Sequence, residues 1–208
     1  MARSTRWSCR TRDLRPSSPM LDDAGVARIG PNALIQTDLV LIERLGEVEA
    51  ARIFATAGVS RDVPDGMVPE TDVRQLFDAL MSERPDDWQV LLTDAGTRTA
   101  DYVMAHRIPR FARTTLRLLP SRLAAPLLAR AITRHAWTFA GSGAFGVTRH
   151  AGTLRLTITH NPIATPGCPW HKAVFARLFR TLAGPRIRVE HETCCAEGAA
   201  ASTFDIVL

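Results

Sequence analysis

Two short segments near the C-terminal end of the chain carry residue types that bind metals. Cys168 is followed by His171, and His191 precedes the adjacent Cys194 and Cys195. Thiolates and imidazoles are ligands that zinc selects in proteins. No C-x-x-C spacing is present, so small buried hydrophobic cysteines are the alternative interpretation. The chain also contains no Ser-His-Asp order, no P-loop and no H-E-x-x-H motif, which leaves these segments as the main candidates for metal chemistry.

A glycine cluster between residues 141 and 146 has the sequence Gly-Ser-Gly-Ala-Phe-Gly and matches the G-x-G-x-x-G pattern. A dinucleotide site needs a helix directly after these glycines, so that its N-terminus lies under the pyrophosphate. Residues 147–158 alternate like a strand instead, and no Asp or Glu occurs between 102 and 189. The cluster therefore predicts a turn or bulge, and we recognise no NAD(P) site.

A basic stripe begins at His106 and continues with Arg110, Arg113 and Arg117. These four residues would share one face if a single helix carried them all. Arginine grips carboxylates with two parallel hydrogen bonds, so the stripe is a candidate anion clamp. A solvated basic face is the alternative, although no acidic residue lies nearby in the sequence to neutralise it.

Charge is strongly segregated along the 208 residues, which have a net charge of +5. Residues 16–101 hold seven Arg and sixteen acidic residues, whereas residues 102–189 hold thirteen Arg, one Lys and no acidic residue. A stretch of this kind creates a positive field that attracts carboxylates, phosphates, acidic lipids or an acidic protein face. The pattern favours an anionic partner, and we expect no nucleic acid and at most peripheral membrane contact.

The length is that of one domain, which we place at residues 20–208. Residues 1–19 form a basic segment with no apolar period and are expected to be a disordered tail, or to precede a translation start at Met20. No secretory signal and no apolar run of membrane-spanning length is present. Four cysteines are too few for a disulfide scaffold, so we expect a reducing, cytoplasmic setting, with a peripheral position at a membrane as an alternative.

Apolar spacing predicts helices through the first two thirds of the chain. We expect one helix at 38–57, capped by Thr37 and ended by Gly58, and a second at 72–83, capped by Thr71. The remaining expected helices run over 86–106, from Pro109 to Pro120, and over 121–135.

The last third alternates with period two and predicts strands at 136–140, 145–150, 154–160, 186–195 and 202–208, with one helix at 170–183 between them. We expect a closing hairpin around Gly198. The predicted fold is therefore α+β, with a helical layer packed on a small antiparallel sheet of about four strands and a helix between its hairpins.

From Ala136 onward the sequence resembles the 4-vinyl reductase domain family. The resemblance rests on Cys168-Pro169-Trp170-His171 with its following helix, on the segment from Val189 to Gly198 that contains Cys194-Cys195-Ala196-Glu197, and on the final Thr203-Phe204-Asp205-Ile206-Val207. In length and in its helical first half, the chain is similar to the photosynthetic members of this family from purple bacteria. The resemblance covers roughly residues 30–208 and implies the ligand-binding fold of vesicle-tethering subunits and phenol-responsive sensors.

Sensors of this family hold zinc with a Cys, a Glu-x-x-Cys pair and a later Cys. Matched residue by residue, Cys168 and Cys194 take two of these places, and His191 stands where the Glu would be. Ser202 stands where the last Cys would be, so Cys195 or Glu192 would have to complete the set. The resemblance thus implies a zinc site of Cys168, His191 and Cys194.

The family resemblance also implies work on a tetrapyrrole in chlorophyll and bacteriochlorophyll biosynthesis for photosynthesis. Its named reaction reduces the 8-vinyl group (4-vinyl in the old numbering) of divinyl protochlorophyllide or a related Mg-porphyrin. Propionates need arginines, the macrocycle needs aromatic side chains, and magnesium needs an axial histidine or water. Candidate porphyrin-binding residues are His106, Arg110, Arg113, His135, Trp137 and Trp170.

Three functions remain open at this point. The first is a tetrapyrrole-binding accessory or carrier that works with other enzymes of the pathway. The second is a genuine vinyl reductase with an unrecognised hydride donor, since hydride transfer needs a bound donor. The third is a basic adaptor that binds a protein or an anionic membrane.

Overall fold

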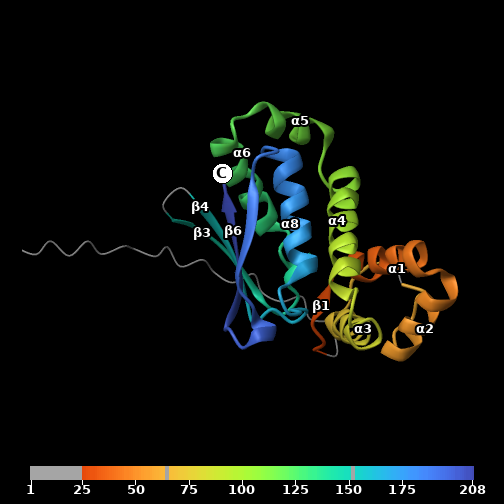
Figure 1. Ribbon diagram of the computed structural model, residues 1–208. Helices are drawn as coiled ribbons and strands as arrows, with labels where there is room; N and C mark the ends of the chain where they lie inside the picture. The colour runs from red at the N-terminus through yellow and green to blue at the C-terminus, as the bar shows by residue number, and fades with distance from the viewer. Residues whose placement is uncertain (1–24, 64–65, 151–152) are drawn as a thin grey trace, which may run out of the picture.

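The computed structural model describes residues 25–63, 66–150 and 153–208, so the predicted tail at 1–19 lies outside the described residues. The chain forms an α+β domain in which helices cover one face of a four-stranded sheet (Figure 1). The helices are α1 Asn32–Leu45, α2 Glu47–Ala57, α3 Glu70–Glu83, α4 Trp88–His106, α5 Arg110–Leu118, α6 Ser121–Arg134, α7 Trp137–Ala140 and α8 Pro169–Leu182. Within the described ranges, no helix is both long and apolar enough to cross a membrane.

The main sheet is antiparallel and has the strand order β3-β4-β6-β5. Its strands are β3 Ala144–His150, β4 Thr153–Thr159, β5 Arg188–Thr193 and β6 Ala201–Val207, and a short 3-10 helix, Cys195–Glu197, precedes β6. The predicted hairpin is confirmed, with Gly198 in the left-handed conformation between β5 and β6. A separate two-stranded pair is formed by β1 Arg28–Ile29, which precedes α1, and β2 Val68–Pro69, which follows α2.

Helix α8 is the central element, because it packs on the sheet with one side and on α4 with the other (Figure 1). Strand β6 alternates so that Phe204 and Ile206 are fully buried. Phe175 of α8 meets Phe204 edge-on, with 5.2 Å between ring centroids. The period-two pattern of β6 and the helical pattern of α8 therefore build one shared core.

The contact between α4 and α8 depends on Gly96. A Cβ atom placed there would lie 2.3 Å from the carbonyl oxygen of Trp170 and 3.0 Å from Cβ of Ala173. Only a residue without a side chain allows the two helix backbones to approach this closely.

We expect Gly96→Ala to lower the free energy of unfolding by about 1–2 kcal/mol. Because the clash is with a backbone oxygen, the cost of overpacking lies in the upper part of its usual range, at about 2–3 kcal/mol, and the gain in helix propensity offsets about 1 kcal/mol. Urea unfolding measures the difference, with Thr97→Ala, on the half-exposed side of α4, as the matched control. A Gly96→Ala protein as stable as wild type would show that α4 and α8 move apart without cost.

Two predicted helix starts differ from the structure. The expected helix at 38–57 is two helices, because Gly46 adopts φ 89° and ψ 163° between α1 and α2. Thr37 is no cap: it lies buried inside α1 and donates its hydroxyl proton to the carbonyl oxygen of Ala33. Thr71 also lies inside its helix, since α3 begins one residue earlier at Glu70. The predicted end at Gly58 is confirmed, with that glycine in the left-handed conformation.

The expected strand at 136–140 is wrong, because Trp137–Ala140 forms the short helix α7. The glycine cluster that follows is the turn from α7 into β3, as expected. Glu70 closes this turn by accepting hydrogen bonds from the backbone N–H and the hydroxyl of Ser142, at 2.6 and 2.7 Å. A Cβ on Gly141 would lie 2.2 Å from this carboxylate. The glycines therefore make room for a carboxylate rather than for a phosphate.

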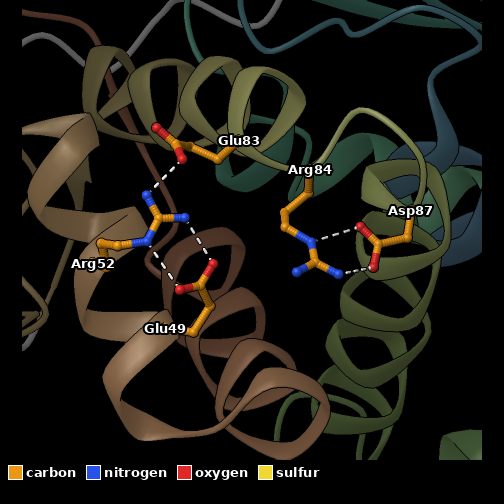
Figure 2. Close-up of polar contacts among 5 residues, drawn as sticks. All are labelled: Glu49, Arg52, Glu83, Arg84 and Asp87. Carbon is orange, nitrogen blue, oxygen red and sulfur yellow. Dashed lines mark hydrogen bonds and ion pairs between the residues drawn. The ribbon is translucent and has the colours of Figure 1, made fainter.

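Arginines in and directly after helices α1 to α4 form ion pairs with carboxylates. Figure 2 shows Arg52 of α2 between Glu49 and Glu83, while Arg84 is held by Asp87. These pairs join α2, α3 and the start of α4. Hydrogen bonding to Asp87 raises the pKa of Arg84 and lowers that of the carboxyl in turn.

Candidate metal centre

The loop before α8 fixes the position of Cys168. The Cys168 N–H donates to the carbonyl oxygen of Thr165 at 2.8 Å, and the residue itself adopts φ 45° and ψ 48°. A positive φ is costly for a residue with a Cβ and persists only where surrounding structure imposes it. Pro169 then begins α8, where a missing N–H costs nothing. The thiol of Cys168 is consequently held at the N-terminus of α8, in the buried interior.

Cys194 reaches the same point from the opposite side, at the end of β5. A register shift between His191 and Thr193 interrupts the pairing of β5 with β6 just before it. Its Sγ lies 3.3 Å from Sγ of Cys168 and donates to the carbonyl oxygen of Thr165 at 3.2 Å. Both cysteines are free and buried, so two thiols face each other with no disulfide between them.

His191 completes the cluster. Ligand atoms of Cys168, His191 and Cys194 all lie within 4.8 Å of one another. Nε2 of His191 is buried and has no hydrogen-bond partner among the described residues. A buried polar atom without a partner is costly, and a metal ion is one way to satisfy it. Two thiols and one imidazole are a zinc donor set, so the residues present fit the ion.

The fourth corner of the cluster is occupied by Ser202. The Cys168 thiol donates to its Oγ at 3.4 Å, and the same oxygen accepts from the N–H of Cys195 at 3.2 Å. The Cys195 thiol points away, toward the carbonyl oxygen of Ile158 at 3.9 Å, and Glu192 is exposed. The residue that replaces the expected fourth cysteine thus lies directly beside the cluster, and neither proposed substitute joins it.

Burial favours the protonated form of the Cys168 thiol and the neutral form of the His191 imidazole. It raises the pKa of the Cys168 thiol to about 12, and the neighbouring Cys194 adds to this effect while Ser202 opposes it. Burial also lowers the pKa of His191. A bound cation reverses this preference, because zinc ligands are deprotonated thiols and neutral imidazoles. A metal ion bound here would release protons and would bind more tightly as the pH rises.

His171 does not join the cluster, although it lies one turn from Cys168. It is fully buried on α8 and its Nε2 lies 3.3 Å from the carbonyl oxygen of Phe139. A carbonyl can only accept, so Nε2 carries the proton. Phe175 and Phe204 lie around the ring at about 6 Å. This histidine ties α8 to α7 in the core.

The expected porphyrin-binding residues fall into separate regions. His106 is the last residue of α4, and its ring stacks on that of Tyr102 with 4.4 Å between centroids. Residues 107–109 are not helical, so α4 and α5 are separate helices. The stripe is therefore not one helical face, which corrects that expectation. Arg110, Arg113 and Arg117 do share one side of α5.

The three remaining candidates are distant from α5. His135 and Trp137 lie at the other end of α6, exposed and half-buried respectively. Trp170 is buried in the first turn of α8 against Phe77, and its Nε1 has no partner among the described residues. The point where α5 meets α8 is the contact of Arg117 with Thr181, which lies about three helical turns along α8 from Trp170.

Two open grooves run along α8 and share Arg180. One, of about 410 Å³, lies between α4 and α8 and is lined by Lys172, Arg180 and apolar side chains such as Ala176. The other, of about 300 Å³, lies beside the junction of α5 and α6 and includes Arg117. Sequence reasoning missed Lys172 and Arg180, although they recur with Ala176 at i, i+4 and i+8 on the polar face of α8, a spacing that reveals a shared face.

The α+β fold of this chain is similar to that of H-NOX domains of known structure. An H-NOX protein from S. oneidensis matches with a TM-score of 0.58 at 10% identity, covering 86% of this chain and 98% of that one. The H-NOX protein from K. algicida gives 0.57 at 12%, with 86% and 96% coverage. These matches take in the helical first half as well as the sheet. They are H-NOX domains and not the vesicle-tethering subunits that we expected, which corrects the predicted kinship.

The chain belongs to the family of the bacteriochlorophyll synthase 23 kDa chains. It is 44% identical over 187 residues to the protein of that name from Cereibacter sphaeroides, covering 86% of this chain and 90% of the relative. The Rhodobacter capsulatus protein is 46% identical over 173 residues, with 80% and 81% coverage. The resemblance to photosynthetic members from purple bacteria is thereby confirmed, although no general family model matches the sequence.

Proposed function

We propose that this chain acts in bacteriochlorophyll biosynthesis as a tetrapyrrole-binding accessory protein. In this role it binds divinyl protochlorophyllide or a related Mg-porphyrin and holds it for 8-vinyl reduction by a partner enzyme. The name of its relatives supports the pathway. The H-NOX domains that share this architecture bind heme, which is itself a tetrapyrrole, and this supports a fold suited to such a ligand.

The arrangement of unpaired arginines along α5 and α8 carries the proposal. Arg110, Arg113 and Arg117 lie on one side of α5, and Arg117 and Arg180 line the same groove. No ion pair to these four arginines is present among the described residues, so their charges are available to a ligand. Propionates need such partners, because a carboxylate placed in a partly apolar site is costly unless paired.

The metal ion has a structural part in this proposal. Cys168, His191 and Cys194 would hold zinc between the N-terminus of α8 and the end of β5. The ion would supply a tetrahedral centre that fixes the loop before α8, and with it the groove lined by Lys172. Ser202 would stand beside the fourth coordination position, donating or accepting a hydrogen bond at that point.

A vinyl reductase is the second candidate, and the 4-vinyl reductase resemblance of the C-terminal third is the observation that favours it. Reduction needs a hydride donor that is bound close to the vinyl group. The glycine cluster does not serve this purpose, since it is a turn closed by Glu70. We therefore place the accessory role first.

Titrating the purified chain with divinyl protochlorophyllide, with and without NADPH, tests both candidates. We expect a shifted absorbance spectrum on binding and no loss of the vinyl group. Arg110→Gln with Arg113→Gln should weaken binding by roughly one to two decades, since a hydrogen bond to a charged group contributes about 1.5–3 kcal/mol. Esterifying the propionates should weaken wild-type binding similarly and should matter little in the double variant.

A matched control changes two arginines that are already paired. Arg44→Gln with Arg98→Gln, which removes contacts to Asp94 and Glu43, should leave pigment binding unchanged. Equal binding of esterified and free-acid pigments by wild type would contradict the arginine contacts. Vinyl reduction with NADPH alone would replace the accessory role by the enzymatic one.

A further inference from the structure

Helices α5 and α6 expose large apolar side chains that nothing in the described chain covers. Phe111 and Leu118 of α5 are 75% and 81% exposed, and Leu123 and Leu127 of α6 are 57% and 51% exposed. We call these four residues, together with Arg122, Arg130 and Arg134, the α5–α6 surface. Contiguous exposed apolar side chains on a folded protein mark interaction sites more often than chance.

The helical spacing places these side chains together on the outward faces. Phe111 and Leu118 are seven residues apart, so they project from the same side of α5, a helix with no buried residue. On α6, Leu123 and Leu127 share their face with Arg130, whereas Ala124, Ala125, Leu128 and Ala129 form the buried side. Both helices are therefore amphipathic, and each also turns two large apolar side chains toward solvent, in addition to the small apolar residues and Leu128 that α6 buries.

The charged side chains that α5, α6 and their flanking residues carry are all positive. Residues 107–134 contain seven arginines and no acidic residue. No ion pair to any of the seven is found in the described part of the chain, whereas Arg44, Arg52, Arg61, Arg74, Arg84 and Arg98 are paired with carboxylates, as for Arg52 in Figure 2. The unpaired charge is thus concentrated on one region rather than spread over the protein.

The α5–α6 surface lies at one end of the molecule. Helix α5 lies across the ends of α4 and α8, and the acidic helices α2 and α3 lie toward the opposite end (Figure 1). An anionic surface would attract the first end and repel the second, which would orient the protein as it approaches.

We propose that the α5–α6 surface docks on an anionic lipid bilayer. Phe111, Leu118, Leu123 and Leu127 enter the boundary between headgroups and acyl chains, and the arginines contact lipid phosphates. Amphipathic helices with aromatic and leucine side chains on one face and basic residues beside them bind membranes in this way. An acidic protein would satisfy the arginines but offers no general reason for four outward apolar side chains. The proposal does not depend on pigment binding.

Co-sedimentation of the full-length chain with vesicles, in the absence of pigment, tests this docking. We expect binding to vesicles of phosphatidylcholine and phosphatidylglycerol at low salt, much weaker binding at high salt, and little binding to phosphatidylcholine alone. Phe111→Ser with Leu118→Ser should weaken binding by roughly tenfold or more. Changing Arg122, Arg130 and Arg134 to Gln should weaken it by roughly a hundredfold.

Val48→Ser is the matched control, because Val48 is 84% exposed on α2 and lies outside the surface. This variant should bind as wild type does, and circular dichroism should show that all variants are folded. Equal binding by wild type and the Phe111/Leu118 variant would overturn the proposal and point to the basic N-terminal segment. Failure to bind anionic vesicles would also overturn it and would favour an acidic protein partner. Pigment binding is measured in a separate titration without vesicles, so the results can contradict membrane docking without contradicting pigment binding, and the reverse.

Discussion

Replacing Cys194 by alanine is expected to remove one zinc ion per chain and to destabilise the protein strongly. Cys194 is one of three ligands whose donor atoms lie within 4.8 Å, so its loss leaves two. A ligand that binds only the folded state at a thousandfold its dissociation constant contributes about 4 kcal/mol. For a domain of this size that amounts to a fall in Tm of roughly 8–16 °C. Elemental analysis and calorimetry measure the two effects.

Cys195→Ala is the matched control for this experiment. The neighbouring thiol points toward Ile158 and lies outside the cluster, so the variant should keep its zinc and most of its stability. A chelator should lower the Tm of wild type to that of metal-free protein and should leave Cys194→Ala unaffected, which separates metal loss from the small cavity left by the thiol. Freshly prepared, chelator-free wild type without zinc would rule out the site.

The general architecture could be predicted because it follows from periodicity. Alternation in β6 and the apolar spacing of α8 are each dictated by one buried face, which sequence patterns record directly. The α+β class, the four-stranded sheet and the intervening helix are therefore confirmed. The turn at the glycine cluster was also predictable, because a strand pattern follows it.

Errors arose where tertiary contacts override local preference. The expected helix at 38–57 runs through Gly46, yet the φ of 89° at this glycine divides the segment into α1 and α2. The segment 136–140 has strand-forming residues, but α7 is held by backbone contact between Gly30 and Thr138 and by His171 against Phe139. Such contacts join residues far apart in sequence, so no window of the sequence contains them.

The candidate sites show the same division. Family resemblance, and not spacing, singled out Cys168, His191 and Cys194, because 26 residues separate the two cysteines that lie 3.3 Å apart. Composition indicated the basic half correctly, but it could not tell that Lys172 and Arg180 line a groove. Nor could it show which face of α5 carries its apolar residues outward.

His171 is expected to make the protein sensitive to acid between about pH 6.5 and about pH 4. Burial lowers its pKa from 6.5 to about 4, although the contact with the Phe139 carbonyl opposes the shift. The folded state therefore binds fewer protons than the unfolded state in this range, and stability rises with pH. The contribution is fully present above about pH 6.5 and is lost as the pH falls toward 4. The expected loss between pH 7.5 and pH 4.5 is about 2.5 kcal/mol.

Urea unfolding of chelator-treated protein at those two pH values isolates this effect from acid release of zinc. His171→Gln keeps a donor for the Phe139 carbonyl but cannot take up a proton, so it should lose about 2.5 kcal/mol less than wild type on acidification. His160→Gln, at an exposed position, is the control and should lose as much free energy of unfolding as wild type when the pH is lowered. His191 has a pKa lowered by burial as well, and its charge also lowers the pKa of His171, so His191→Gln should likewise reduce the loss of stability on acidification. If His171→Gln and wild type lose equal stability, the core histidine is not the acid-sensitive group, and the buried contact that ties α8 to α7 survives protonation.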